Sequence, residues 1–273
     1  MHTEMHIELK EERLFDTLLS GACTFQFLST KLKFYFGTED ALRNRLAALV
    51  QGNYLRTMKY KDAEKSQKKN DEEDDNGVDN KGRKNVGKHA LYVLGERGKK
   101  WLIDHRKAEE HEIRDLLPSP GTVAHELVVV SLARRVRRER DYIPYKLLYY
   151  DDPACRKVLK IKEPPDLLCE VRPIALTTHY GYRLGLEVHN TMPVQAVVKK
   201  ALRQHEHQMA CLTFTRDKYV ELQEAMRKHP DLKGRVYFAL MSDFCRQAGA
   251  IFGTNFYNWE GKPISLYPEF RKI

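Results

Sequence analysis

The chain has 273 residues, 42% hydrophobic and 31% charged, which is enough for two compact domains with apolar cores. Lysine and arginine number 47 against 38 aspartates and glutamates, and the net charge of +9 suits a polyanionic partner such as nucleic acid. No run approaches the roughly 20 apolar residues of a membrane span, and the polar N-terminus lacks the apolar core of a signal peptide. The five cysteines are scattered, so we expect a cytoplasmic protein without a disulfide framework or a membrane partner.

The first hundred residues predict three helices followed by a hairpin. Helices are expected over 8–20 and 24–32, and a third begins after Thr38. Its leucines at 42, 46 and 49 form one buried stripe, while Arg43 and Asn44 face outward. Strands are expected over 54–58 and 90–94, and a further helix then runs through Leu102.

The segment 62–88 between the two predicted strands is dense in charge of both signs and nearly free of large apolar residues. Such a stretch buries too little surface to offset its ordering entropy, so a disordered loop is expected. Three helices and a two-stranded wing resemble the winged helix-turn-helix plan, with 45–55 as recognition helix and first wing strand. This resemblance implies a DNA-binding domain over 1–107, followed by a linker over 108–121.

Winged helices read duplex DNA with one helix and follow phosphates with the wing. The residues expected at double-stranded DNA are Arg43, Asn44, Arg45 and Arg56, with Arg45 lying closest to the buried stripe. A winged helix used for protein docking or dimerisation is the alternative.

The second domain, 122–273, predicts a long helix followed by a mixed sheet. The helix over 122–140 carries a cluster of arginines near its end, at Arg134, Arg135, Arg137 and Arg138. This cluster suits either phosphate binding or a solvated helix C-terminus. The later elements, in chain order, are strands over 145–150, 166–171 and 182–189, a helix over 194–209, a strand over 211–215, a helix over 218–228 and a strand over 235–240. Hairpin-type strands followed by a crossover helix indicate an α/β domain with a mixed sheet flanked by helices.

Two acidic residues stand at the ends of neighbouring predicted strands. Asp166 opens the strand over 166–171, and Glu187 lies near the end of the strand over 182–189. Adjacent strands bring such carboxylates close enough to share a divalent ion, and oxygen ligands suit Mg²⁺ or Mn²⁺. Lys199 or Lys200 on the following helix would stabilise charge on a phosphate. The structural alternative is an aspartate in a turn and a glutamate in its own salt bridge.

This order of elements resembles the core of the PD-(D/E)XK nuclease superfamily. The resemblance implies that Asp166 and Glu187 are its two acids. The position of its lysine holds His189, so Lys199 or Lys200 would supply the amine. The implied activity is metal-dependent cleavage of DNA, such as nicking, with Mg²⁺ or Mn²⁺ as cofactor.

The two halves together resemble the replication-relaxation proteins of bacterial plasmids and integrated mobile elements. The resemblance lies in 45–55, in 125–129, in 165–166 followed by 186–188, and in 199–200. It implies a DNA-binding protein acting in the replication, transfer or maintenance of such an element. Where the family tends to have an acid two residues after the strand glutamate, this chain has His189, which makes a binding-only domain more credible.

Two alternatives therefore stay open. One is a regulator without catalysis, whose second domain dimerises or senses an effector, and the other is a protein–protein adaptor. On the helix over 194–209, His205 and His207 would project about 200° apart, which favours a surface pair over a metal site. The aromatic residues at 252, 256, 257 and 259 suit core packing or a dimer contact more than base stacking.

Overall fold

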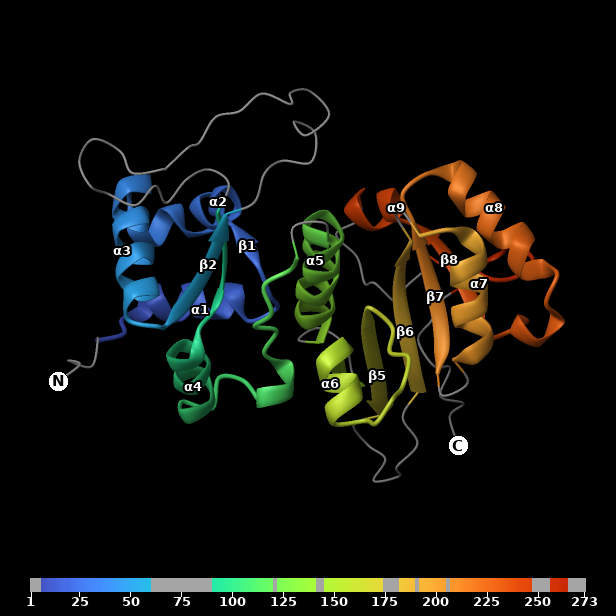
Figure 1. Ribbon diagram of the computed structural model, residues 1–273, viewed down its shortest axis with the longest axis horizontal. Coiled ribbons are helices and arrows are strands. Elements are labelled where there is room, and N and C mark those ends of the chain that lie inside the picture. Colours follow the sequence, from blue (N-terminus) through green and yellow to red (C-terminus); the bar gives the residue numbers. More distant parts are fainter. Residues whose placement is uncertain are drawn as a thin grey trace. The chain divides into compact units, whose positions relative to one another are not determined.

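The computed structural model describes residues 6–59, 90–119, 122–140, 145–173, 182–189, 192–204, 207–246 and 256–264 (Figure 1). The predicted loop over 62–88, the end of the predicted linker, His205 and Phe252 lie outside the described residues. The chain divides into two compact units, Met1–Val130 and Ser131–Ile273.

The N-terminal unit combines helices with a small antiparallel sheet. Its elements in chain order are α1 (Leu9–Leu18), β1 (Cys23–Thr24), α2 (Phe25–Phe36), α3 (Glu39–Gln51), β2 (Leu55–Lys59), β3 (Ala90–Leu94) and α4 (Glu96–Asp104). The sheet has the strand order β1-β3-β2, and both pairings are antiparallel. The three predicted helices, the hairpin and the following helix are confirmed, whereas the two-residue strand β1 is too short to leave a sequence pattern.

Local signals fix the helix boundaries in this unit. The hydroxyls of Thr24 and Thr38 accept hydrogen bonds from the amides of Phe27 and Ala41, both at 3.1 Å, and so cap α2 and α3. The apolar stripe of α3 is fully buried in a core with residues of α1, α2 and the sheet. Helix α2 runs four residues beyond the predicted end and stops at Gly37, whose φ of 73° suits glycine.

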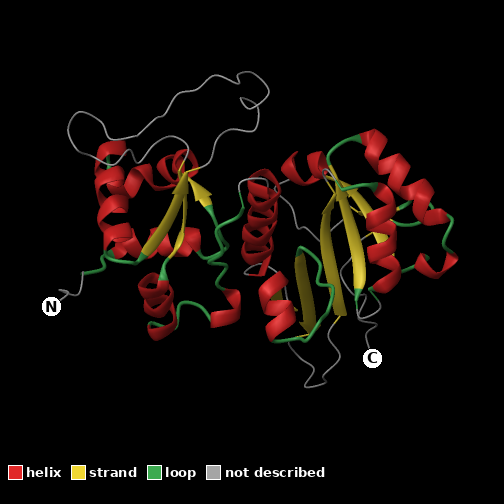
Figure 2. Ribbon diagram, viewed as in Figure 1, coloured by secondary structure: helices red, strands yellow, loops and turns green. Residues whose placement is uncertain are grey.

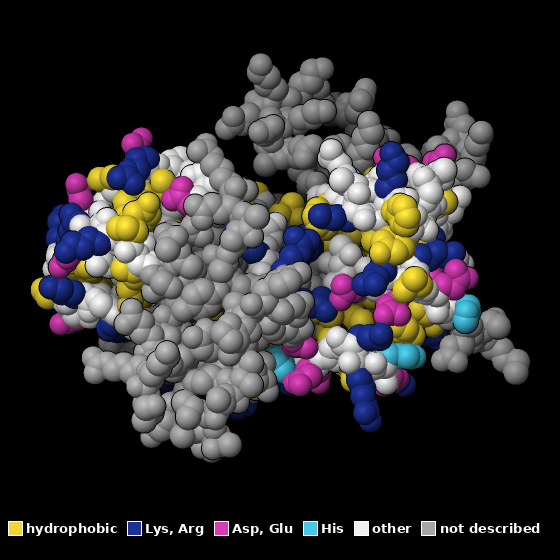
Figure 3. Space-filling view, turned by 180° about the vertical axis from the view of Figure 1, so that it is seen from behind, with side chains coloured by type: hydrophobic (Ala, Val, Ile, Leu, Met, Phe, Trp, Pro, Cys, Tyr) yellow, Lys and Arg dark blue, Asp and Glu magenta, His cyan; other side chains and the backbone are white. Residues whose placement is uncertain are grey.

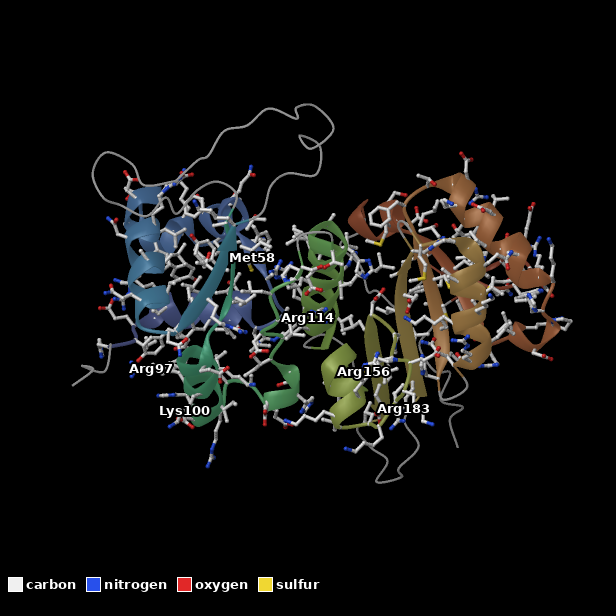
Figure 4. The ribbon with its side chains drawn as sticks, viewed as in Figure 1. Met58, Arg97, Lys100, Arg114, Arg156 and Arg183 are labelled. Carbon is white, nitrogen blue, oxygen red and sulfur yellow. The ribbon has the colours of Figure 1, made fainter. Side chains whose placement is uncertain are left out.

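The segment after α4 packs against the N-terminal unit. A short 3₁₀ helix, η1 (Glu110–Glu112), precedes Ile113, which joins the core of the unit. The amide of Arg114 donates to the carbonyl of Leu19 at 3.0 Å. Its guanidinium donates two hydrogen bonds, of 2.7 and 2.8 Å, to the carboxylate of Glu126 on helix α5 (Val123–Arg140). Figure 4 shows Arg114 beside this helix. Residues predicted as linker therefore make specific contacts in this unit.

The C-terminal unit holds a mixed sheet with flanking helices (Figure 2). Its elements are β4 (Tyr145–Asp151), α6 (Asp152–Lys157), β5 (Leu167–Pro173), β6 (Tyr182–His189), α7 (Val194–Arg203), β7 (Gln208–Thr213), α8 (Arg216–Arg227), η3 (Pro230–Leu232), β8 (Val236–Leu240), α9 (Met241–Arg246), β9 (Phe256–Tyr257) and β10 (Pro263–Ile264). The strand order of the described sheet is β10-β9-β8-β7-β6-β5-β4. The pairs β6–β7 and β7–β8 are parallel and the others antiparallel, so the predicted mixed α/β class is confirmed.

Helices α7 and α8 share an apolar core with one face of β7 and β8. Met209 and Cys211 of β7 and Phe238 of β8 lie in this core, and Tyr257 and Trp259 pack against it. Glu187 is the parallel partner of Cys211, so its side chain projects toward the same helices.

The helix predicted over 194–209 is shorter, which corrects the prediction for the histidines. Helix α7 ends at Arg203, and Gln208 already pairs with Leu184 of β6. Parallel pairing with a buried strand therefore outweighs helix propensity over these residues. His207 lies outside the helix and is buried, with 7% of its surface exposed, so it is not a surface histidine.

Candidate active site

Asp166 and Glu187 meet where β5 begins and β6 nears its end. In the antiparallel ladder Leu167 pairs with Leu186, and continuing this register by one residue places Asp166 opposite Glu187. The Asp166 carboxylate accepts a hydrogen bond of 2.7 Å from the amide of Val188, which fixes it against β6. The strands thus bring together the two carboxylates that the sequence predicted as a pair.

Glu187 is a buried acid with one paired oxygen and one unpaired oxygen. Its side chain is 4% exposed, and its Oε1 accepts a hydrogen bond of 2.5 Å from Nζ of Lys200. Its Oε2 is buried and has no hydrogen-bond partner in the described part of the chain. Burial, and next the negative charge of Asp166, raise the pKa of Glu187 to about 7, although Lys200 opposes the shift. The free oxygen therefore lies where a cation would be stabilised.

Of the two candidate lysines, the structure places Lys200 at the carboxylate of Glu187. Val197, Val198 and Ala201 anchor α7 on the sheet, and Lys200 extends from the edge of this buried face with 22% of its side chain exposed. Lys199 lies one residue earlier, about 100° round the helix, and is exposed. Nothing in the described contacts joins Lys199 to either acid.

Two histidines flank Glu187 on the same face of β6. His189, two residues after Glu187, is 1% exposed, and neither ring nitrogen has a hydrogen-bond partner among the described residues. Burial, and then the charge of Lys218 on α8, lower the pKa of His189. On the other side the ring of His207 lies against Gly185, two residues before Glu187. The predicted helix over 194–209 would have put His207 on its surface, whereas its position in the structure depends on where α7 ends.

The donor set at this site fits a hard divalent cation. No group of three or more histidine, cysteine, aspartate or glutamate side chains in the described chain is arranged to hold a metal. Magnesium, however, is commonly bound by one or two carboxylates, with water and substrate phosphates completing its shell. Asp166 and the unpaired oxygen of Glu187 supply such a pair, so these two residues would hold Mg²⁺ or Mn²⁺.

The arginines predicted to contact DNA in the N-terminal unit largely have partners within that unit. Arg45 donates to Oε1 of the fully buried Glu11 at 2.7 Å and to the carbonyl of His6 at 3.0 Å. Arg43 lies 4.2 Å from the centre of the Phe25 ring and 3.5 Å from Glu39. Arg56 donates to the carbonyl of Asp115. Asn44 on α3 is exposed and lines a shallow groove with Tyr35, Phe36 and Ala48.

The predicted arginine cluster lies on the part of α5 that belongs to the C-terminal unit. Arg134, Arg135 and Arg137 are partly buried, and Arg138 is exposed. On the face drawn in Figure 3, lysine and arginine side chains are interspersed with acidic and hydrophobic ones. In the described residues that it shows, the surface therefore mixes the three kinds of side chain.

Comparison with protein-family models, curated proteins and solved structures finds no match to this chain. In the described residues, no helix is both long enough and apolar enough to cross a membrane.

Proposed function

We propose that this protein binds DNA and hydrolyses phosphodiester bonds at a metal-dependent site in its C-terminal unit. The observation that carries the proposal is the meeting of Asp166, Glu187 and Lys200, which come from three different elements, with a buried carboxylate oxygen left unpaired. A structural salt bridge between Glu187 and Lys200 needs neither Asp166 nor a free oxygen. Two acids that can hold a metal ion and an amine that can stabilise negative charge are groups suited to phosphoryl transfer.

The residues of the chain have separate tasks in this proposal. Asp166, held by the amide of Val188, and Glu187 would hold the metal, which when bound would polarise the phosphate and lower the pKa of a water ligand. Lys200 already lies at Glu187 and would stabilise the negative charge that develops on the phosphate. The Asp166–Val188 hydrogen bond keeps the two strands in the register that the site needs.

DNA binding by the N-terminal unit is supported by its order of elements. Three helices, a short strand and a hairpin follow in the order α1-β1-α2-α3-β2-β3, which resembles the winged helix-turn-helix plan. Its helix α3 presents Asn44 to solvent, while Arg43 and Arg45 are held by intramolecular contacts. We therefore assign base contact to Asn44, and a role in the replication, transfer or maintenance of a mobile element stays a prediction.

A regulator without catalysis is the second candidate. It is favoured by His189, which stands where the nuclease resemblance calls for a lysine or an acid, and by the existing ion pair of Glu187. In that case the N-terminal unit would act on DNA and the sheet would serve dimerisation or effector binding.

A plasmid-nicking assay separates the two candidates. Supercoiled plasmid is incubated with the full chain and Mg²⁺ or Mn²⁺, or with chelator, beside the variants Asp166→Asn, Glu187→Gln and Lys200→Met. We expect metal-dependent nicking that falls by about 100-fold or more in the two carboxylate variants.

Two matched variants control for non-specific effects. Lys199→Met removes the neighbouring exposed lysine, and Glu163→Gln removes a carboxylate that is 41% exposed and pairs with Arg203. Both are expected to nick at the wild-type rate. DNA binding without nicking under any metal would contradict the catalytic proposal and favour the regulator.

A further inference from the structure

His207 is a buried histidine whose hydrogen-bonding groups are unused. Its Nδ1 and Nε2 are both shielded from solvent and have no hydrogen-bond partner in the described structure. An imidazole ring always carries at least one N–H donor. Leaving such a donor buried and unpaired costs about 1–3 kcal/mol, so the arrangement suits a ligand that is absent from the free protein.

The backbone of β6 makes room for this ring. A Cβ at Gly185 would lie 2.6 Å from Cδ2 and 2.7 Å from Nε2 of His207, and 2.9 Å from Cβ of Pro165. The imidazole therefore occupies the space that a side chain at position 185 would take. Pro165 is followed by Asp166, and Gly185 lies on the same face as Glu187, so His207 stands next to the carboxylate pair.

Several positive charges act on His207. Its pKa is lowered to about 4, first by burial and then by the charges of Lys200, Arg183 and Arg235. Arg183 lies near the start of β6 (Figure 4) and is 3.4 Å from Glu170. The Arg183 side chain is 36% exposed and that of Lys200 is 22% exposed, so both can approach a ligand from solvent.

A second unpaired group lies three residues earlier in the chain, on Gln204. Gln204 is 5% exposed, and its Nε2 donates to the carbonyl of Glu163 at 2.8 Å while its Oε1 has no partner. The guanidinium of Arg235 donates to the backbone carbonyl of the same glutamine. Arg235 is thereby tied to the segment that leads from α7 to His207.

We propose that His207 donates a hydrogen bond to a phosphate oxygen of the substrate, in an anion subsite that Arg183 and Arg235 complete. The inference rests on the proposed phosphodiesterase function and names the phosphate subsite next to its carboxylates. A neutral imidazole offers the N–H donor, and the positive charges of Lys200, Arg183 and Arg235 stabilise an anion at this ring. The ligand chemistry is a phosphate group, either one within a nucleic-acid strand or a free phosphate.

The test uses the full chain carrying Asp166→Asn, so that the oligonucleotide is not cleaved during the measurement. Long-range ¹H–¹⁵N spectra of the histidine rings are recorded while inorganic phosphate is added, and separately while a short DNA oligonucleotide is added. The signal of His207 is assigned from its loss in His207→Phe. We expect this signal to shift saturably with the oligonucleotide, and a parallel shift with inorganic phosphate would show that free phosphate also enters the subsite.

Affinity measurements complete the experiment. His207→Phe and Arg183→Gln should each weaken oligonucleotide binding about tenfold, as expected for one charge-assisted hydrogen bond, whereas His207→Gln keeps a donor and should lose less. His229→Phe, a histidine after α8 in the same unit, serves as the matched control and should bind normally. Thermal melts of each variant show whether it is folded, and Arg183→Gln keeps the test informative if a His207 variant is not.

A His207 signal unmoved by both ligands, or unchanged affinity in folded His207→Phe and Arg183→Gln, would overturn the inference. These measurements need neither metal nor turnover, so they stand apart from the nicking assay. If the protein nicks plasmid but its His207 signal does not shift with phosphate or oligonucleotide, the subsite alone is overturned. Phosphate binding without nicking would overturn the catalytic proposal alone.

Discussion

At the scale of single residues, two adjacent lysines on α7 have opposite surroundings. Lys200 is bonded to the buried Glu187, whereas Lys199 is exposed. Removing Lys200 leaves a buried carboxylate without its cation, which typically costs several kcal/mol. The difference in stability between a variant that lacks Lys200 and one that lacks Lys199 therefore measures how much the ion pair with Glu187 contributes.

We predict that Lys200→Met lowers the free energy of unfolding by about 2–4 kcal/mol at pH 8, and that Lys199→Met changes it by less than about 0.5 kcal/mol. The pKa of Glu187 is raised to about 7, so the folded chain binds the extra proton between its ordinary value of 4.5 and that pH. Protonation relieves the unpaired charge, and the loss in Lys200→Met should be smaller at pH 5.5. Urea unfolding at both pH values measures this, and equal stability of the two variants at pH 8 would contradict it.

His207 makes stability depend on pH in the opposite sense. Its folded pKa of about 4 lies below the ordinary 6.5, so between these values the unfolded chain binds more protons. The free energy of unfolding is expected to fall by on the order of 2–3 kcal/mol as the pH falls from 6.5 to 4. Well above pH 6.5 this histidine is neutral in both states and has no such effect on stability. Thermal unfolding of His207→Phe and of wild type across this pH range separates the contribution of His207 from that of His189. Identical pH profiles would contradict the prediction.

At the scale of elements, most of the fold follows from local signals. Thr24 and Thr38 supply helix caps, and the leucine stripe of α3 has the period of a buried helix face, so these elements could be predicted from the sequence. The end of α7 could not be predicted, because it depends on the pairing of β7 with β6 rather than on local propensity. For the same reason the sequence predicted Asp166 and Glu187 on neighbouring strands but wrongly placed His207 on the surface of a helix.

The role of Arg45 likewise depends on tertiary contacts. The sequence places it on a predicted recognition helix, whereas its guanidinium is bonded to Glu11 of α1, which is fully buried. The partner lies 34 residues away, and a periodicity argument does not reveal such a contact.

We therefore predict that Arg45→Met destabilises the N-terminal unit by about 3 kcal/mol, since it leaves a buried charge unpaired. Adding Glu11→Gln to the same chain should recover part of the loss. Asn44→Ala should leave stability within about 0.5 kcal/mol of wild type and weaken DNA binding instead. Hydrogen exchange of the amides of α1 and α3 reports the stability, and unchanged exchange in Arg45→Met would count against this assignment.

For the molecule as a whole, the proposal of a polyanionic partner rests on the net charge of +9 and on the order of elements in the N-terminal unit. Binding that neutralises phosphates releases counterions, so the affinity falls with added salt by about 0.9 log unit per log unit for each contact. We predict a slope of about −3 or steeper for a duplex of 20 to 30 base pairs, measured by fluorescence anisotropy. An affinity that does not respond to salt would instead indicate a protein–protein adaptor.

We propose that Asp166 and Glu187 form a site for one divalent cation. A titration with Mn²⁺ followed by electron paramagnetic resonance tests this claim without any substrate. We predict one bound Mn²⁺ per chain in wild type and in Glu163→Gln, and a loss of affinity of at least about tenfold in Asp166→Asn and Glu187→Gln. Absence of bound Mn²⁺ in the folded wild type, or binding that both carboxylate variants retain, would contradict the claim.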